Sequence, residues 1–229
     1  MTDTTHAHTA AKDADRIREA LASGPVTVPT GAGISTDSGV PDHRGPDSPP
    51  RRPMAYQEFV GDAAFRRHYW ARNHVGWRHV ERTRPNDGHL ARRAVSGREE
   101  PAVRLSAPNP GFAEEVADAV LARTEHFRVA DCVGCGGTLK SDIVHFGENV
   151  PKPRVMEAYA MVESAASLLV VGSSLTVFSG RRLVKRAVAM GRPVVIPNRG
   201  APRCDDTATL TLDHGCSPVL RSLADTHRV

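Results

Sequence analysis

Three short apolar runs constrain the fold of this chain most, because a turn follows each of them almost at once. Residues 25–28 lead into Gly31, residues 168–171 end at Gly172, and residues 193–197 stop at a polar turn. Segments with helical spacing alternate with these runs along the chain. Buried strands that alternate with helices predict a parallel α/β sheet covered on both faces.

The periodicity of the remaining segments predicts where the other elements lie. Apolar residues at helical spacing predict helices at residues 13–23, 56–82, 85–97, 156–166, 181–190 and 219–224, with a weaker helical pattern at 114–121. Strand-prone residues predict two further short strands at 143–146 and 209–212. A chain of 229 residues that is 40% hydrophobic and 24% charged is apolar enough to bury a core.

The charged residues and cysteines exclude several classes of protein. The net charge is +4, and the many arginines are scattered among acids without interleaved aromatics, which predicts a solvated surface and no specific nucleic-acid groove. Four cysteines are too few for a disulfide scaffold and indicate a reducing compartment. The polar N-terminal residues, and the lack of the roughly 18 consecutive apolar residues that span a bilayer, favour a cytoplasmic protein without membrane contact.

A glycine turn, Gly31-Ala32-Gly33-Ile34-Ser35, lies between the first apolar run and residues of helical character. Glycines at such a place let the backbone approach a diphosphate, whose charge the free N–H groups of a helix start favour. A plain tight turn uses the same residues, and Thr36 stands where the third glycine of the G-x-G-x-x-G fingerprint would fall. The turn alone is therefore a weak signal.

The longer string from Gly31 to Gly45, GAGISTDSGVPDHRG, is far more specific. It resembles the NAD-binding signature of the sirtuins, the NAD-dependent protein-lysine deacylases. Five further segments resemble sirtuin motifs in the same order: Pro85-Asn86 with His89, Cys132-x-x-Cys135-Gly136-Gly137, residues 144–151, residues 172–177 and residues 195–200. Six ordered motifs identify the chain as a member of this family.

The resemblance implies a Rossmann-like parallel sheet interrupted by a small inserted module. Residues 13–53 and 141–229 would form the NAD-binding domain. Residues 54–140 would form the insert, with a helical part at 54–97 and the remnant of a zinc module at 98–140. The sheet itself is expected to be incomplete.

The resemblance also implies the reaction and the residues that hold the cofactor. In the family, the acyl oxygen of a substrate lysine attacks the ribose of NAD as nicotinamide leaves, and a histidine then acts as general base. The partner would be an acylated-lysine protein or peptide. By position, Gly31, Ala32, Gly33 and Ile34 would lie along the diphosphate, Asp42 and Arg44 beside the cofactor, Gly172, Ser173 and Ser174 at a ribose or phosphate, Asn198, Arg199 and Gly200 at the adenosine ribose turn, and the Cys216 backbone at the adenine.

The chain is short in one place. Only 42 residues separate His89 from Cys132, and none of them resembles the family's Gln-Asn-Val-Asp-Gly-Leu-His turn or its catalytic His-Gly pair. An internal deletion with its junction near Gly97-Arg98 explains both losses. Two function classes follow: a deacylase with impaired turnover, or a non-catalytic binder of NAD or ADP-ribose (or the product of a decaying gene).

The zinc site is affected in the same way, because the first Cys-x-x-Cys pair is absent. Cys132 and Cys135 supply two of the four ligands that a structural zinc ion requires. His126, Asp131 or a second chain could complete the set, but a metal-free or weakly bound state is expected.

Several side chains depart from the family pattern. His43 stands where a phenylalanine is usual, and His145 stands where an apolar residue is usual. Neither His126 nor His145 can be named as the catalytic base. Tyr69 and Arg72 lie three residues apart on one helical face and resemble the acidic-acyl selectors of some sirtuins, although an exposed helix with a half-buried tyrosine explains them equally well.

Overall fold

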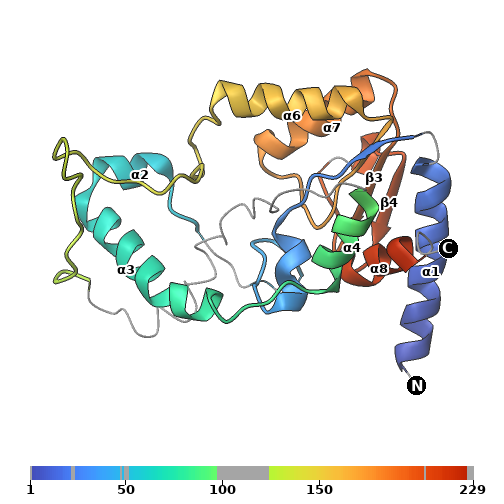
Figure 1. Cartoon of the computed structure of the whole chain (residues 1–229), viewed down its shortest axis with the longest axis horizontal. Helices are drawn as coiled ribbons and strands as arrows, with labels where there is room; N and C mark the ends of the chain where they lie inside the picture. Colours follow the sequence, from blue (N-terminus) through green and yellow to red (C-terminus); the bar gives the residue numbers. More distant parts are fainter. Residues whose placement is uncertain are drawn as a thin grey trace. The chain divides into compact units, whose positions relative to one another are not determined.

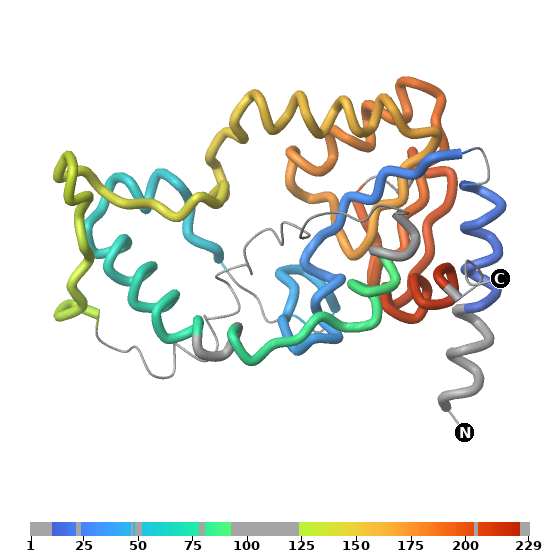
Figure 2. The backbone as a smooth tube through the Cα atoms, viewed as in Figure 1, coloured from blue at the N-terminus to red at the C-terminus, as the bar shows by residue number. Residues whose placement is uncertain are grey.

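The computed structural model describes residues 2–21, 24–46, 48, 52–96, 124–203 and 205–225. The chain divides into two compact units (Figure 1). Unit 1 contains Met1–Pro49, Arg84–Pro101 and Pro151–Val229, and unit 2 contains Pro50–Thr83 and Ala102–Val150. The chain therefore enters unit 2 twice (Figure 2).

Unit 1 is built on a four-stranded parallel sheet. Its strands are β1 (Val26–Thr27), β2 (Ser167–Leu169), β3 (Val194–Asn198) and β4 (Leu210–Asp213), and their order in the sheet is β1-β2-β3-β4. The register pairs Thr27 with Leu168, Leu169 with Val195, and Asn198 with Asp213. The predicted parallel α/β sheet is confirmed, and all four strands lie on runs that the sequence indicated.

Among the described residues, five α-helices belong to this unit: α1 (Thr2–Leu21), α4 (Asp87–Ser96), α6 (Lys152–Ser164), α7 (Phe178–Ala189) and α8 (Cys216–Asp225). Because alternate residues of a strand face opposite sides of a sheet, the two faces bury different side chains. Leu169 and Val171 pack with α1, α4 and α8. Leu168 and Val170 pack with α6 and α7 on the other face (Figure 1). The expected covering of both faces is thus present.

Unit 2 contains α2 (Tyr56–Gly61) and α3 (Ala63–Val80), where one continuous helix was predicted over residues 56–82. The break lies at Asp62, whose backbone is extended with φ −133° and ψ 124°. Its side-chain Oδ1 accepts a hydrogen bond from the backbone N–H of Ala64 at 2.6 Å. Aspartate in this position caps the following helix, which explains why a new helix starts there.

The strand predicted at 143–146 is wrong, since only Phe146 forms a β-bridge, to Ala55. The chain turns here because the Lys140 ammonium donates to the backbone carbonyls of Ser141, at 2.9 Å, and Ile143, at 2.5 Å. A side chain that donates hydrogen bonds to several nearby backbone carbonyls bends the segment, so these residues do not pair with a neighbouring strand.

The boundaries of the units differ from the expected domain limits at two places. Helix α4 belongs to unit 1, because it packs on α8, although residues 54–97 were expected in the insert. Residues 141–150 belong to unit 2, although they were expected in the NAD-binding domain.

Helices α1, α6, α7 and α8 all begin earlier than predicted, α7 at Phe178 and α8 at Cys216. Helix α1 begins at Thr2, and α6 begins at Lys152 with a proline in its first turn, where a fixed φ favours helix initiation. The helix predicted at 114–121 lies outside the described residues. Among the helices that are described, none combines the length and apolarity needed to cross a membrane.

Candidate functional site

The glycine turn after β1 packs directly against the loop after β2. The backbone N–H of Gly31 donates to the Val171 carbonyl at 2.8 Å, and that of Gly33 donates to the Gly172 carbonyl at 2.9 Å. A Cβ on Gly31 would overlap the Gly172 oxygen and come within 2.7 Å of the Ser173 Cα. Gly172 has φ +61°, and a Cβ there would lie 2.5 Å from the Ile34 nitrogen. These glycines allow a backbone approach that no other residue permits.

The turn continues into a 3₁₀ helix, η1 (Ala32–Ser38), with Gly31 as its N-cap. No side chain among the described residues caps this end. Ile34 is buried and fixes the segment on the core. Thr36, the residue that breaks the fingerprint, donates its hydroxyl to the Gly33 carbonyl at 3.0 Å. The arrangement can present backbone N–H groups to an anion, as a diphosphate site requires.

Asn86, at the start of α4, holds η1 in place. Its Nδ2 donates to the Ile34 carbonyl at 2.8 Å, while its Oδ1 accepts from the backbone N–H of His89 at 3.1 Å and from the Ser217 hydroxyl at 3.3 Å. His89 Nε2 lies 3.2 Å from Ser35 Oγ. One amide side chain therefore joins η1, α4 and α8.

The imidazole of His89 completes this junction in its neutral form. Burial lowers the pKa of His89 below its usual value, Arg92 lowers it further, and Asp37 opposes them. His89 Nδ1 lies 3.2 Å from the Asn86 backbone nitrogen and 3.0 Å from Asn86 Oδ1, and Nε2 lies 3.2 Å from Ser35 Oγ. The reciprocal bonds between Asn86 and His89 form a capping box. Asn86 and His89 were recognisable in the sequence as a motif, but neither they nor Ser35 and Ser217 were among the predicted site residues.

We expect Asn86→Ala to lower the free energy of unfolding by about 1–2 kcal/mol, because it removes a helix cap and the hydrogen bond from Asn86 Nδ2 to the Ile34 carbonyl. NAD affinity should fall roughly tenfold as η1 loosens, since 1.4 kcal/mol corresponds to a factor of ten. Denaturant unfolding and calorimetric titration with NAD measure the two effects. The control is Asp87→Asn, at the next position, where an exposed ion pair to Arg221 spans 3.3 Å. Equal losses in both variants would contradict a specific role for Asn86.

Asp42 shapes the loop that carries two residues predicted to lie beside the cofactor, Asp42 itself and Arg44. Its Oδ1 accepts from the backbone N–H of Gly45 at 2.7 Å and of Arg44 at 3.3 Å, and also from the Ser48 hydroxyl. A carboxylate that accepts hydrogen bonds from consecutive backbone N–H groups stabilises a turn. Asp42 and Arg44 therefore lie on one organised segment of unit 1.

The loops after β2 and β3 are also organised by their own side chains. Ser173 Oγ accepts from the Leu175 N–H at 3.3 Å, and Ser174 Oγ lies 3.1 Å from Thr176 Oγ1. Buried Asn198 donates from Nδ2 to the carbonyls of Arg199 and Gly200, both at 2.9 Å. With Nδ2 committed to the loop, Oδ1 is the atom of Asn198 suited to a ribose hydroxyl.

Cys216 begins α8 and is buried. Its Sγ lies 3.8 Å from the Pro197 carbonyl. Burial, with smaller contributions from Asp37 and Asp42, raises the pKa of the thiol to about 12. The thiol therefore stays neutral and unreactive at physiological pH, and only the backbone of Cys216 is left to recognise a ligand.

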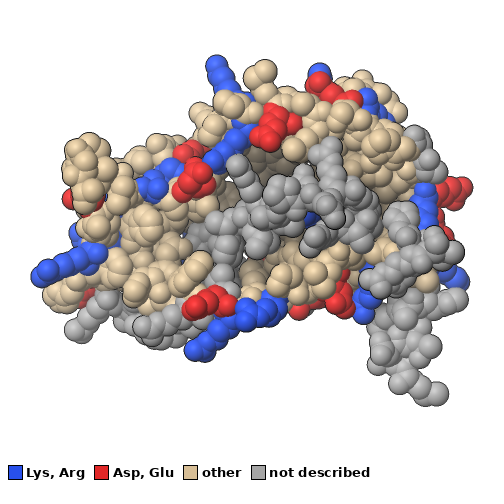
Figure 3. Space-filling view, in the orientation of Figure 1, with Lys and Arg blue, Asp and Glu red and all other residues tan. Residues whose placement is uncertain are grey.

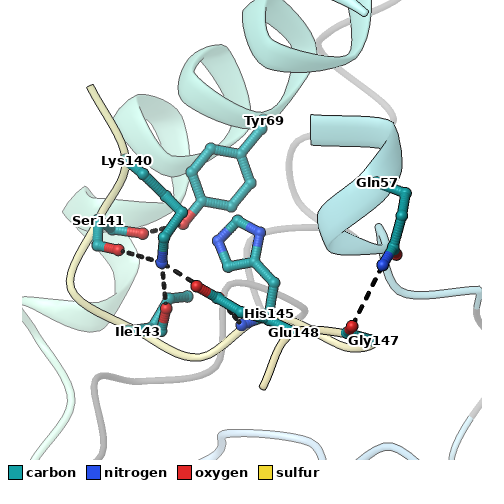
Figure 4. A network of polar contacts seen from close by, with 8 residues as sticks. All are labelled: Gln57, Tyr69, Lys140, Ser141, Ile143, His145, Gly147 and Glu148. Atoms are coloured by element: carbon teal, nitrogen blue, oxygen red, sulfur yellow. Dashed lines mark hydrogen bonds and ion pairs between the residues drawn. The ribbon is translucent and has the colours of Figure 1, made fainter. Parts of the chain in front are cut away.

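In unit 2, the imidazole of His145 lies beside the Tyr69 ring (Figure 4) and also packs against Phe59. Its ring centroid lies 5.0 Å from that of Phe59 and 5.1 Å from that of Tyr69, and the residue is 7% exposed. Within the described residues, neither ring nitrogen has a hydrogen-bond partner. Burial and the nearby Lys140 ammonium lower the pKa of His145, while Glu148 opposes them.

The segment around His145 is fixed to α2 and α3 (Figure 4). Tyr69 Oη lies 2.5 Å from Ser141 Oγ, and Gln57 Nε2 donates to the Gly147 carbonyl at 3.2 Å. The Glu148 carboxylate accepts from the His145 N–H at 2.8 Å and pairs with Lys140 at 3.2 Å. Tyr69 is buried and hydrogen-bonded here, which agrees with the structural explanation of the Tyr69–Arg72 pair.

Cys132 and Cys135 lie on a narrow turn in unit 2. The Cys132 N–H donates to the Gly137 carbonyl at 2.9 Å, and the Gly136 N–H donates to the Cys132 carbonyl at 2.8 Å. An antiparallel bridge between Asp131 and Thr138 closes the turn, which we call the knuckle (residues 131–138). Both thiols are free. The described residues contain no group of three or more His, Cys, Asp or Glu side chains able to hold a metal ion, so a complete zinc site does not fit them.

Comparisons with known proteins identify the family. The Sir2 family profile matches residues 112–179. The NAD-dependent protein deacetylase 1 of Mycobacterium avium (strain 104) is 45% identical over 260 residues, covering 90% of this chain and 92% of that protein. This chain belongs to the Sir2 family. The sirtuin of the same name from Streptomyces coelicolor is 39% identical, with 91% of this chain and 88% of that protein covered.

Solved structures agree with this assignment. A Sir2 structure with a p53 peptide and NAD+ matches with a TM-score of 0.70 at 25% identity, covering 93% of this sirtuin and 97% of that chain. A Sir2 bound to an acetylated peptide matches with a TM-score of 0.69 at 23% identity, covering 93% and 98%, and supports the fold alone. The Rossmann-like architecture expected from the motifs is therefore confirmed.

The comparison with the Mycobacterium avium sirtuin also measures what this chain lacks. The alignment spans 260 positions but includes about 206 residues of this chain (90% of 229), which leaves about 54 of the 260 positions without a counterpart here. A shortfall of this size agrees with an internal deletion. Its position near Gly97-Arg98 stays a prediction, because residues 97–123 lie outside the described part of the chain.

Proposed function

We propose that this sirtuin is an NAD-dependent protein deacetylase of reduced turnover, whose substrate is the acylated lysine of a protein or peptide. The observation that carries the proposal is the 45% identity to a protein named NAD-dependent protein deacetylase 1 over 90% of the chain. The glycine turn supports it, because Gly31, Gly33 and Gly172 have no side chain that would keep a diphosphate away from the backbone.

The other predicted cofactor contacts support the proposal by their place in unit 1. The loops after β2 and β3 leave the sheet at the carboxyl ends of its strands, where open α/β sheets bind ligands. When bound, NAD supplies the ribose carbon that receives the acyl oxygen as nicotinamide leaves. We assign the diphosphate to Gly31, Ala32, Gly33 and Ile34, a place beside the cofactor to Asp42 and Arg44, a ribose or phosphate to Gly172, Ser173 and Ser174, and the adenosine side to Asn198, Arg199, Gly200 and Cys216.

A second candidate function is non-catalytic binding of NAD or ADP-ribose. The missing alignment positions favour it, together with the lack of a catalytic histidine motif in the sequence. His145 is a poor substitute base, because aromatic rings enclose it and its neighbour Lys140 is cationic. A product of a decaying gene is the third outcome that an experiment has to separate.

Two measurements on the same preparation test the proposal. We expect NAD to raise the melting temperature, while NAD consumption with an acetyl-lysine peptide runs roughly 10²–10⁴-fold slower than with the Mycobacterium avium sirtuin, the range that a general base contributes. Turnover equal to that relative would refute the impairment. A thermal shift without turnover would support the binder, and neither signal would support a gene remnant.

We also propose a reducing, cytoplasmic location. The free thiols of Cys132, Cys135 and Cys216 support it, since neighbouring thiols stay unpaired under reducing conditions. Charged side chains of both signs lie interspersed on the visible face of the described residues (Figure 3), which supports a soluble surface without a nucleic-acid partner.

A further inference from the structure

The knuckle holds two thiols side by side at the surface of unit 2. Cys135 is exposed, and Cys132 is partly exposed. The Cys132 sulfur accepts hydrogen bonds from the backbone N–H groups of Gly134 and Cys135, and the Cys135 thiol donates a further one to it. The two sulfur atoms are therefore neighbours that solvent reaches.

The backbone of the knuckle keeps the two cysteines together. The Gly136 N–H donates to the Cys132 carbonyl at 2.8 Å, and the Cys132 N–H donates to the Gly137 carbonyl at 2.9 Å. The first of these bonds spans four positions, so residues 132–136 form one helix-like turn. Residues three positions apart on such a turn are neighbours on the same side. A disulfide between Cys132 and Cys135 therefore requires little movement of the backbone.

The surroundings of the pair favour dithiol chemistry. Among the described residues, no third His, Cys, Asp or Glu joins the two thiols to complete a metal site. Gly134, Gly136 and Gly137 have no side chains that would keep a small molecule away from the sulfurs. In reducing compartments, disulfides of Cys-x-x-Cys pairs are usually transient and form by thiol–disulfide exchange. An exposed cysteine beside a second, resolving cysteine is the arrangement which that exchange requires.

We propose that Cys132 and Cys135 are a modification site, at which a small-molecule disulfide converts the two thiols into an intramolecular disulfide. The exposed Cys135 gives its proton to water, and its sulfur attacks one sulfur of the small disulfide. That step releases one small thiol and leaves a mixed disulfide on Cys135. The Cys132 sulfur then loses its proton, attacks the Cys135 sulfur and releases the second small thiol.

The exchange is balanced and reversible. The two cysteines lose two electrons and two protons, and the small disulfide takes up the same number to become two thiols. An excess of the small thiol reverses both steps. The inference depends neither on NAD binding nor on turnover.

The test exposes the full chain to mixtures of reduced and oxidised glutathione in the presence of a metal chelator. After an acid quench, the chain is unfolded, alkylated and digested with trypsin, which releases residues 129–140 with both cysteines on one peptide. We expect this peptide to lose both alkylation sites and the mass of two hydrogen atoms as the proportion of oxidised glutathione rises. The buried Cys216 should stay fully alkylated in the same samples. Excess reduced glutathione should restore the original peptide.

Four variants make the test specific. Cys132→Ser should stop at the mixed disulfide and keep one glutathione on Cys135. Cys135→Ser leaves the less exposed thiol, which should take up glutathione roughly tenfold more slowly. Gly136→Pro keeps both thiols but can neither adopt φ +66° nor donate to the Cys132 carbonyl, so the equilibrium constant for the disulfide should fall roughly tenfold. Cys204→Ser removes a thiol elsewhere in the sequence and should behave as the wild type.

Three results would each overturn the proposal. The first is a wild-type peptide that keeps both alkylation sites at every glutathione ratio. The second is a disulfide that joins two chains instead of Cys132 and Cys135 of one chain. The third is an intramolecular disulfide that forms as readily in Gly136→Pro as in the wild type, because the knuckle would then not hold the two thiols in place.

Discussion

Gly31→Ala is expected to abolish NAD binding and to destabilise unit 1. The added Cβ would overlap the Gly172 carbonyl oxygen and come within 2.7 Å of the Ser173 Cα. Neither neighbour can move freely, because the Gly31 N–H is bonded to Val171 and the Gly172 N–H to Pro197. Overpacking against fixed backbone costs on the order of 1–3 kcal/mol or more. Calorimetric titration with NAD should show no binding at concentrations that saturate the wild type.

The matched control for this prediction is Gly180→Ala in α7, in the same unit. A Cβ there would make an ordinary contact at 3.7 Å with Leu175. Alanine in a helix is favoured over glycine by roughly 0.5–1 kcal/mol, so this variant should be slightly more stable and should bind NAD normally. If Gly31→Ala bound NAD as tightly as the wild type, the glycine turn would not be the diphosphate site.

The sheet was predictable from the sequence because its central strands are buried on both faces. Residues 168–171 and 193–197 are continuous apolar runs, and their burial in β2 and β3 follows from packing between two helical layers. The turns after them were predictable too, since Gly172 has a positive φ and Asn198 fixes its own loop. Each of these features follows from residues that are close together in the sequence.

Of the features that sequence reasoning missed, one depends on distant residues and two depend on local side-chain hydrogen bonds. The junction at Asn86 joins it to Ile34 and Ser217, which lie 52 and 131 positions away. The break at Asp62 was missed because the apolar residues keep their helical spacing across it, whereas the Asp62 side chain caps a new helix. The strand predicted at 143–146 does not form, because the Lys140 ammonium donates hydrogen bonds to the nearby backbone carbonyls of Ser141 and Ile143. For the junction at Asn86, a capping pattern of Asn followed three residues later by His was the one local signal that was available.

His145→Phe is expected to stabilise unit 2 and to reduce its sensitivity to acid. Phenylalanine fits the same aromatic enclosure, whereas the imidazole buries two nitrogens that have no partner among the described residues. An unsatisfied buried polar group costs roughly 1–3 kcal/mol, so the free energy of unfolding should rise by about 1–2 kcal/mol at pH 7.5. Denaturant unfolding measures the gain.

The acid dependence follows from the direction of the pKa shift. Burial lowers the pKa of folded His145 below its usual 6.5, so the unfolded chain takes up the proton first as the pH falls. Stability is therefore constant above the unfolded value and declines as the pH drops through the folded one. His145→Phe should remove this part of the decline and leave the part that belongs to His89, whose pKa is also lowered.

Two further variants separate packing from titration at this position. His145→Gln removes the titrating group but keeps a buried polar side chain, so it should flatten the pH dependence without raising stability at pH 7.5. His126→Gln changes an exposed histidine and should leave both quantities at their wild-type values. Unfolding curves between pH 5 and pH 8 compare the three. A His145→Phe profile that declines as steeply as the wild type would show that the acid sensitivity of unit 2 arises elsewhere, because phenylalanine cannot bind the proton.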